Sequence, residues 1–296
     1  MRIEVAVDAR DGVGEGPFWD EQEQALWWVD ITGKAVQRWA LGTRERRRWT
    51  MPDFPSAVVL RAAGGALVAM RDGLCFLDPT SGGLQLFCRP DADRPDNRSN
   101  EAKCGPSGDF WLGTMDNNLQ PDGSPRQMTG NTGALYRVLA DGSFTREVDG
   151  VGLSNTLAWA DDGRRLLFAD TLTGVISAFA VQDDGRLGTR SVFSDEKLPG
   201  FCDGSTIDSQ GFLWNARFAG SCLIRFAPDG RVDRMIELPV TNPTCCCFGG
   251  PDLKTLYVTS ARFGLSTEQL ARNPAEGAVL ALSADVPGQP SVRFTG

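Results

Sequence analysis

Four side chains that offer oxygen ligands recur at similar positions ahead of an apolar strand pattern. They are Glu15, Asn100, Asn155 and Asp203, and each lies ten to twelve residues before the central apolar residue of the pattern that follows it. Equivalent positions in a toroidal repeat fold meet near its axis, so we expect these oxygens to converge. With a charge of −2 from Glu15 and Asp203, the group suits one divalent cation. All-oxygen ligation allows Ca²⁺, Mg²⁺ and Mn²⁺ and leaves room for Zn²⁺ or Fe²⁺.

Each of these residues has a simpler explanation when it is taken alone. Asp203 precedes a glycine, as turn aspartates do, and Asn155 could be a turn amide that bonds its own backbone. Glu15 alone would be a loop carboxylate. Turn residues have no reason to recur at one offset in separate repeats, so the shared offset favours a joint site. The other two repeats place Ser56 and the pair Cys245 and Cys246 at this offset.

The chain of 296 residues contains no histidine. A Ser-His-Asp triad, a Cys-His dyad, an imidazole metal site and an imidazole base are therefore all excluded. Any chemistry must use carboxylates, amides, Lys, Arg, thiols or a bound ion.

Charge and hydropathy exclude further classes of protein. The 30 basic and 38 acidic residues give a net charge of −8, so no overall positive field attracts nucleic acid. The short basic run at 44–48 is expected to be a solvated face. No apolar run reaches the roughly eighteen residues of a membrane span. The eight cysteines form no C-x-x-C pair and no export signal is evident, so we expect buried, reduced thiols and a cytoplasmic location.

An apolar strand pattern repeats six times along the chain and predicts the architecture. The steps between copies are 41 to 46 residues, with one step of 57, which is the period of a propeller blade of four short strands. We therefore predict an all-β, six-bladed β-propeller with a central metal site, as a single domain over 1–296. A strand near Ile3 to Val7 would complete the last blade. The central residues of the six copies are Leu26, Leu67, Phe110, Leu167, Leu213 and Leu256.

Two segments depart from the strand pattern. The long step places a surplus at 116–132, and a loop of this length in a compact repeat is expected to be functional, here as a lid. Ser266 to Leu270 has the capping-box pattern of one short helix.

An ordered series of short motifs resembles the SMP-30/gluconolactonase/regucalcin-like family. The motifs run over almost the whole chain and are jointly specific. One difference stands after Asn100, where many members carry Asp-Gly and this chain has Glu101 and Ala102. The matching segments are 14–17, 27–30, 98–100, 110–115, 154–156, 203–205, 211–214 and 248–251.

The resemblance implies a six-bladed propeller that binds a divalent cation and hydrolyses a sugar lactone, an aldono-1,4-lactone or aldono-1,5-lactone, to the open acid. It further implies that Glu15, Asn155 and Asp203 are metal ligands, and that Arg98 and Asn100 bind the substrate, with Asn100 also near the metal. An acidic substrate contact of some members has no clear counterpart, and Asp116 and Asp122 are the candidates for it.

The residues suggest a mechanism for such a reaction. A cation would polarise the lactone carbonyl and activate water, and Asp203 is the best candidate to move the proton in a chain without histidine. Arg98 would orient substrate oxygens, whereas Lys103 is expected to be a solvated neighbour.

Two other functions fit the same sequence. An activated water could also attack a non-sugar lactone or an organophosphate. Alternatively, the propeller could bind calcium without catalysis, because fold alone proves no activity. The expected partner is a small-molecule lactone, with no nucleic acid and no membrane. The sequence leaves the oligomeric state and the identity of the lactone open.

Overall fold

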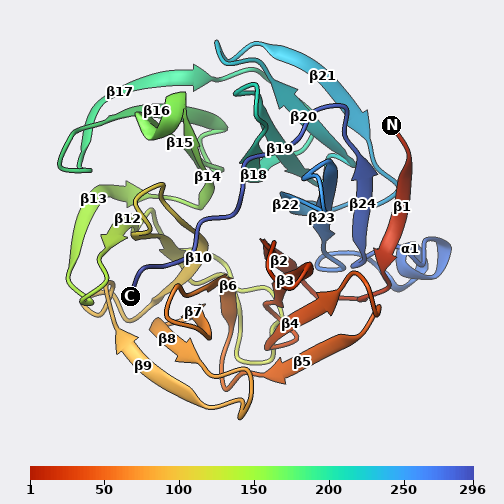
Figure 1. Cartoon of the computed structure of the whole chain (residues 1–296), viewed down its shortest axis with the longest axis horizontal. Coiled ribbons are helices and arrows are strands. Elements are labelled where there is room, and N and C mark those ends of the chain that lie inside the picture. Colours follow the sequence, from red (N-terminus) through yellow and green to blue (C-terminus); the bar gives the residue numbers. More distant parts are fainter.

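Six four-stranded antiparallel sheets surround a central axis in the computed structural model, which describes residues 1–296 (Figure 1). This architecture confirms the predicted six-bladed β-propeller. The first three blades contain β2 (Gly14–Asp20), β3 (Ala25–Asp30), β4 (Ala35–Ala40) and β5 (Arg46–Thr50); β6 (Pro55–Leu60), β7 (Ala66–Met70), β8 (Gly73–Leu77) and β9 (Leu84–Cys88); and β10 (Asn97–Cys104), β11 (Phe110–Asp116), β12 (Gly133–Val138) and β13 (Phe144–Val151).

The remaining blades follow the same order from the axis outward, with one exception at the closure. They contain β14 (Ser154–Ala160), β15 (Arg165–Asp170), β16 (Val175–Val181) and β17 (Leu187–Ser194); β18 (Phe201–Ile207), β19 (Leu213–Phe218), β20 (Cys222–Phe226) and β21 (Val232–Glu237); and β22 (Pro243–Gly249), β23 (Thr255–Ser260), β24 (Val279–Ser283) and β1 (Ile3–Val7).

Burial falls from the axis to the rim of each blade. Every residue of the inner strands β6, β14 and β22 is buried or nearly so, whereas the outer strands β5 and β21 are largely exposed. The basic run at 44–48 lies mostly on β5, where its arginine side chains face solvent. This placement agrees with the solvated face expected from the sequence.

The first strand closes the ring by pairing with the last blade. β1 runs antiparallel to β24, with Ile3 opposite Leu282 and Val5 opposite Leu280. The sequence predicted this closure, which covers the outer edge that β24 would otherwise expose.

Aromatic contacts hold neighbouring blades together. Trp19 of β2 stacks on Tyr257 of β23 with ring centroids 5.4 Å apart, and Trp214 of β19 meets Phe248 of β22 at 6.0 Å. These large side chains bury apolar area between sheets whose strands are not paired with each other. The tryptophans of the repeated strand are therefore core residues.

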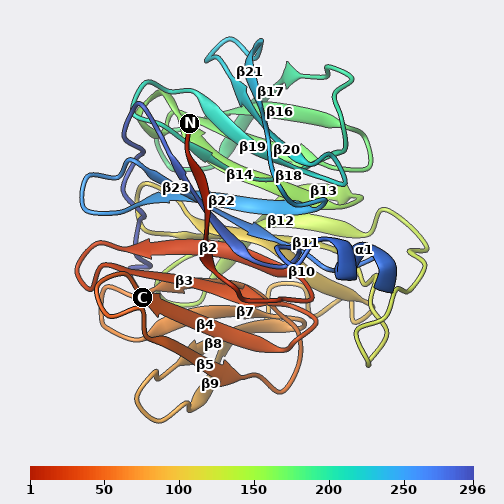
Figure 2. The same ribbon diagram turned by 90° about the vertical axis from the view of Figure 1, so that its right-hand side faces the viewer.

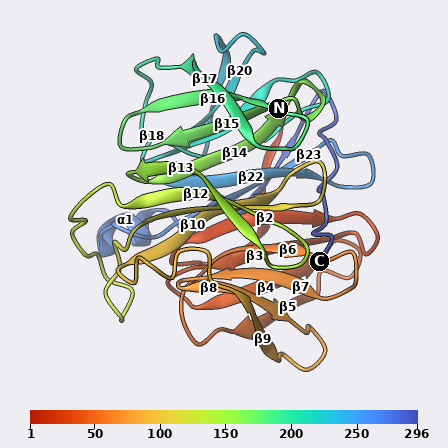
Figure 3. The same ribbon diagram turned by 90° about the vertical axis from the view of Figure 1, so that its left-hand side faces the viewer.

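Different segments of the chain cover the two ends of the propeller. The loop after β11 and the helix α1 (Thr267–Arg272) project from the same end (Figures 2 and 3). Helix α1 begins with the expected capping box at Ser266. The C-terminal tail crosses the opposite end, where Phe294 is fully buried and pairs with Arg61. The one α-helix, of six residues, has neither the length nor the hydropathy of a membrane span.

Candidate metal centre and cavity

A shift in strand pairing occurs at the same place in every inner strand. The shift in β2 lies next to Glu15, and the shift in β14 lies next to Asn155. The shifts in β10 and β18 enclose Asn100 and Asp203. The inner strands β6 and β22 have equivalent shifts. Such β-bulges turn side chains out of the regular alternation and are typical of functional sites. The bulges therefore explain why residues at one sequence offset all face the axis.

One bulge has a strained backbone. Thr156, which follows Asn155, has a φ of 51°, a left-handed conformation that β-branched residues rarely adopt. Its Oγ1 donates a hydrogen bond of 2.7 Å to the backbone carbonyl of Asp203 on the next blade. This contact ties the strand carrying Asn155 to the strand carrying Asp203.

All five residues that the sequence selected line one cavity of about 280 Å³: Glu15, Arg98, Asn100, Asn155 and Asp203. The cavity lies at the end of the propeller that carries the loop after β11, because Asn118 and Leu119 of that loop are also in its wall. Their roles as ligands and substrate contacts stay predictions.

Three of the polar residues form a hydrogen-bonded series across two blades. Arg98 donates from Nη1 to Oδ1 of Asn100 at 2.8 Å, and Asn100 donates from Nδ2 to Oδ1 of Asn155 at 3.3 Å. Asn155 in turn donates to Oγ1 of Thr171 at 2.9 Å. The series fixes the orientation of both amides.

The cavity carboxylates, of partly buried Glu15 and buried Asp203, have no cationic partner in contact. The buried ion pairs of the protein involve other acids, such as Asp208 with Arg225. Glu15 accepts only the amide of its neighbour Gly16, at 2.8 Å. Burial raises the pKa of Glu15 to about 8, and the Glu101 carboxylate adds to the rise. Burial and then the Glu15 carboxylate hold the pKa of Asp203 well above its ordinary value.

This donor set fits a hard divalent cation. The carboxylates of Glu15 and Asp203 repel each other, and a positive ion between them would stabilise both. Asn155 can add a neutral oxygen, and its amide is already oriented by Asn100 and Thr171. The residues present can therefore hold the cation that the sequence suggests.

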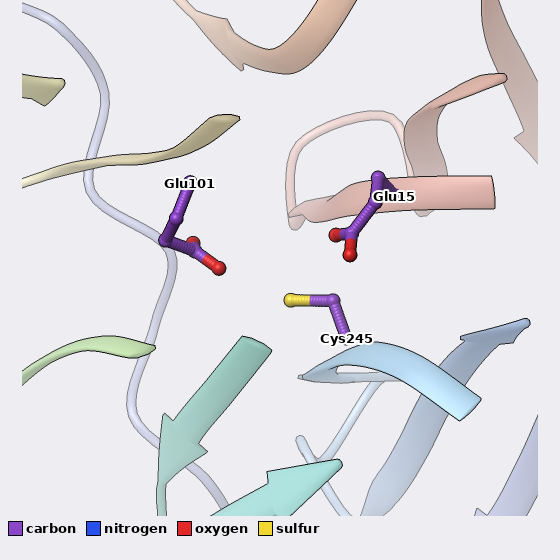
Figure 4. A group of neighbouring side chains, drawn as sticks. All are labelled: Glu15, Glu101 and Cys245. Atoms are coloured by element: carbon purple, nitrogen blue, oxygen red, sulfur yellow. The ribbon is translucent and has the colours of Figure 1, made fainter. Parts of the chain in front are cut away.

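A second group lies deeper in the channel and includes residues that the sequence did not select. Ligand atoms of Glu15, Glu101 and Cys245 lie within 4.8 Å of one another, and the three side chains point toward a common space (Figure 4). Glu101 is only 5% exposed. Burial raises its pKa to about 7, against the opposing effect of Lys103.

The expectation that Lys103 is a solvated neighbour is wrong. Its side chain lies in the channel wall and Nζ donates to the Ser205 carbonyl at 2.6 Å. The sequence indicated only one member of this group, because Cys245 stands at the shared offset of the sixth repeat. The offset could not identify Glu101 and Lys103 as channel residues, because a bulge determines which side chains of β10 face inward.

The two acidic candidates of the long loop do not reach the cavity. Asp116 is buried and its Oδ2 accepts a hydrogen bond from Oγ1 of Thr129 at 2.8 Å, so it holds the loop in shape. Asp122 is exposed and caps a turn by accepting from Ser124. The loop instead contributes Asn118, whose Oδ1 accepts from Nε and Nη2 of Arg98, both at 3.0 Å.

The expectation of buried thiols holds for six of the eight cysteines. All eight are free, and Cys75 and Cys88 are only partly buried. In β22 consecutive residues point to opposite sides, so that Cys245 faces the channel while Cys246 packs in the core beside Trp214. The run of three cysteines therefore does not bind one metal together.

Comparisons with known proteins agree with this fold. Residues 13–262 match the family model described as SMP-30/Gluconolactonase/LRE-like region. Regucalcin of Danio rerio is 34% identical over 300 residues, with 100% of this chain and 99% of the relative covered. The crystal structure of a calcium-binding protein, regucalcin, from Agrobacterium tumefaciens has a TM-score of 0.90 and 29% identity, covering 98% and 96% of the two chains.

A further solved structure supports the fold alone. A gluconolactonase of Xanthomonas campestris has a TM-score of 0.78 at 23% identity, covering 95% of this chain and 89% of its own. The region matched by the family model, residues 13–262, contains all five cavity residues that the sequence selected. The chain therefore belongs to the SMP-30/gluconolactonase/LRE-like family.

Proposed function

We propose that this protein is a divalent-metal-dependent lactonase. The observation that carries the proposal is the meeting of Glu15, Asn155 and Asp203 in one cavity with Arg98 and Asn100 beside them. A scaffold propeller has no need of buried carboxylates that repel each other at its axis. The family, whose model is described as SMP-30/Gluconolactonase/LRE-like region, supports lactone hydrolysis as the reaction class.

Glu15, Asn155 and Asp203 would hold the cation, with Asn100 near it. Bound there, the cation would polarise the lactone carbonyl and lower the pKa of a water molecule. Calcium is the first ion to test, because the similar Agrobacterium protein is described as calcium-binding. Mg²⁺, Mn²⁺, Zn²⁺ and Fe²⁺ follow, since oxygen ligands accept each of them.

The chain's own residues would move the proton and orient the ring. Water attacks the carbonyl carbon, and the Asp203 carboxylate accepts the proton that the water loses. When the ring C–O bond breaks, that proton passes to the departing ring oxygen, and the product is the open hydroxy acid. Arg98 would orient substrate oxygens and oppose the developing negative charge.

A panel of substrates and ions tests this proposal. Protein stripped with a chelator is supplied with one metal at a time and assayed on pentonolactones, hexonolactones, alkyl lactones and an aryl phosphotriester. We expect lactone turnover that depends on the ion. Turnover of the phosphotriester alone would favour the organophosphate alternative, and cation binding with no turnover of any ester would favour a calcium-binding propeller.

A sugar lactone is the substrate class that the family resemblance suggests. It needs several hydrogen-bonding side chains to replace the water around its hydroxyl groups. The lining of the cavity therefore bears directly on the choice of lactone.

A further inference from the structure

Polar and apolar side chains both line the cavity. The polar side chains, here called the polar side, are grouped around Glu15, Arg98 and Asp203. The apolar side chains, here called the apolar rim, come from five blades: Ile31, Leu119, Leu172, Phe201, Phe218 and Phe263. These residues share the cavity with the candidate cation ligands, so one small molecule could contact both sides.

Two members of the apolar rim are unusually exposed. Leu172 is 55% exposed and Phe201 is 57% exposed, although most large apolar side chains of the inner strands are buried. Both lie next to the polar group in sequence: Phe201 precedes Asp203 by two residues, and Leu172 follows Thr171, which accepts from Asn155. Their exposed area is therefore positioned to be covered by whatever occupies the site.

Arg98 and Thr171 keep few donors free for a ring with many hydroxyls. Arg98 makes four hydrogen bonds within the protein, to Ser99, Asn100 and Asn118, which leaves one of its five N–H groups. Thr171 donates its hydroxyl proton to the Cys202 carbonyl at 2.7 Å. A hydroxyl that enters the apolar rim would lose its water without gaining a partner, which is unfavourable.

We propose that the apolar rim binds an alkyl or aryl substituent of the lactone, so that the preferred substrates are apolar-substituted γ- or δ-lactones rather than fully hydroxylated aldonolactones. This inference rests on the proposed lactonase function for the ring, whereas the rim itself is a binding site that can be tested without turnover.

Chain length in the substrate gives the first test. The series is γ-butyrolactone, γ-valerolactone, γ-hexalactone and γ-nonalactone, with glucono-δ-lactone for comparison, all with the metal-loaded protein. Burial of each added methylene should raise kcat/KM by about fourfold until the rim is filled. Glucono-δ-lactone turned over faster than every alkyl lactone, with no rise along the series, would overturn the inference while leaving the lactonase proposal intact.

Variants of the rim give the second test. Phe201→Ser and Leu172→Ser should each reduce the ratio of kcat/KM for γ-nonalactone over γ-butyrolactone by about tenfold, because a serine cannot cover the chain. Phe144→Ser and Leu86→Ser are matched controls, since these side chains are 44% and 50% exposed on outer strands far from the cavity. The controls should keep the ratio of the parent protein, and an equal fall in all four variants would contradict the rim's role.

A binding measurement separates this inference from the lactonase proposal. Alkyl-substituted γ-lactams, which resist hydrolysis, are titrated calorimetrically into the parent protein and the two rim variants. Affinity that rises with chain length only in the parent, with a negative heat-capacity change, supports the rim even if no lactone is hydrolysed. Affinity independent of chain length overturns it even if lactones are turned over.

Discussion

At the scale of single residues, the unusual feature is a set of acids without cationic partners in contact, of which Glu101 and Asp203 are buried and Glu15 is partly buried. Burial raises the pKa of Glu15 to about 8 and of Glu101 to about 7, and raises that of Asp203 well above its ordinary value. Isolated buried charges are costly, so such groups are kept for a ligand that compensates them. The proposed cation provides that compensation.

Replacement of Asp203 by Asn should separate function from stability. Asp203→Asn keeps the size of the side chain but removes a proposed ligand and proton acceptor, so kcat/KM for lactones should fall by about a hundredfold or more. In chelator the melting temperature should rise, because a buried charge beside Glu15 is removed. Asp229→Asn is the control, since Asp229 lies in an exposed turn beside Arg231. Full activity in Asp203→Asn would contradict its proposed role.

The same pKa shifts predict how stability depends on pH when the cation is removed. Because Glu15 and Glu101 have raised pKa values in the folded state, their contribution to stability is greatest below their unfolded pKa and is lost as pH rises through about 7 to 8. The Tm of the chelated protein should therefore fall between pH 5 and pH 8. Glu15→Gln should flatten the fall, and a rise over this range in the parent protein would contradict the shifts.

At the scale of the elements, the inner strands combine close packing with bulges. Gly204 lies in the bulge of β18 against β22, where an added Cβ would be 2.2 Å from Sγ of Cys245 and 2.9 Å from its Cα. Only a residue without a side chain allows the two blades to approach this closely. The close approach brings Cys245 beside Glu15 in the channel.

A glycine substitution tests this packing. Gly204→Ala should lower the free energy of unfolding by about 2 kcal/mol or more, because the methyl group overlaps β22. Gly42→Ala is the matched control, since its Cβ would meet no atom within 4 Å, and it should be neutral or slightly stabilising. Urea denaturation measures both, and equal midpoints for the two variants would contradict the close contact.

The elements also show what could be predicted from sequence. The period fixed the number of blades, and the shared offset selected Glu15, Asn155 and Asp203 because equivalent positions of a repeat are equivalent in space. The offset could not identify Glu101 and Lys103, because a bulge in β10 decides which of its side chains face the channel. The sequence also could not exclude Asp116 as a substrate contact, because its hydrogen bond to Thr129, in a distant part of the same loop, is seen only in the structure.

At the scale of the whole molecule, the ring closes through a single outer strand from the start of the chain. β1 pairs with β24 (Figure 1). The aromatic pair Trp19 and Tyr257 joins the first blade to the last. Closure holds the inner strands at fixed distances around the axis. The geometry of the cavity therefore depends on contacts between strands at the outer edge of the propeller.

Removal of the closing strand tests this dependence. Deletion of residues 1–8 should lower the free energy of unfolding by about 3 kcal/mol or more, since pairing hydrogen bonds contribute about 1 kcal/mol each. The exposed edge of β24 should also promote self-association, which light scattering detects. Val5→Thr, on an exposed face of β1, is the control and should leave both properties unchanged. A deletion variant as stable as the parent would show that the last blade holds without β1.

The central claim is that one divalent cation binds among Glu15, Asn155 and Asp203, and anomalous X-ray scattering from crystals grown with Mn²⁺ tests it most directly. The account predicts one strong peak within about 2.0 to 2.6 Å of side-chain oxygens from all three residues. A peak bound only by Glu101 and Cys245, or no peak in the cavity at saturating Mn²⁺, would contradict it.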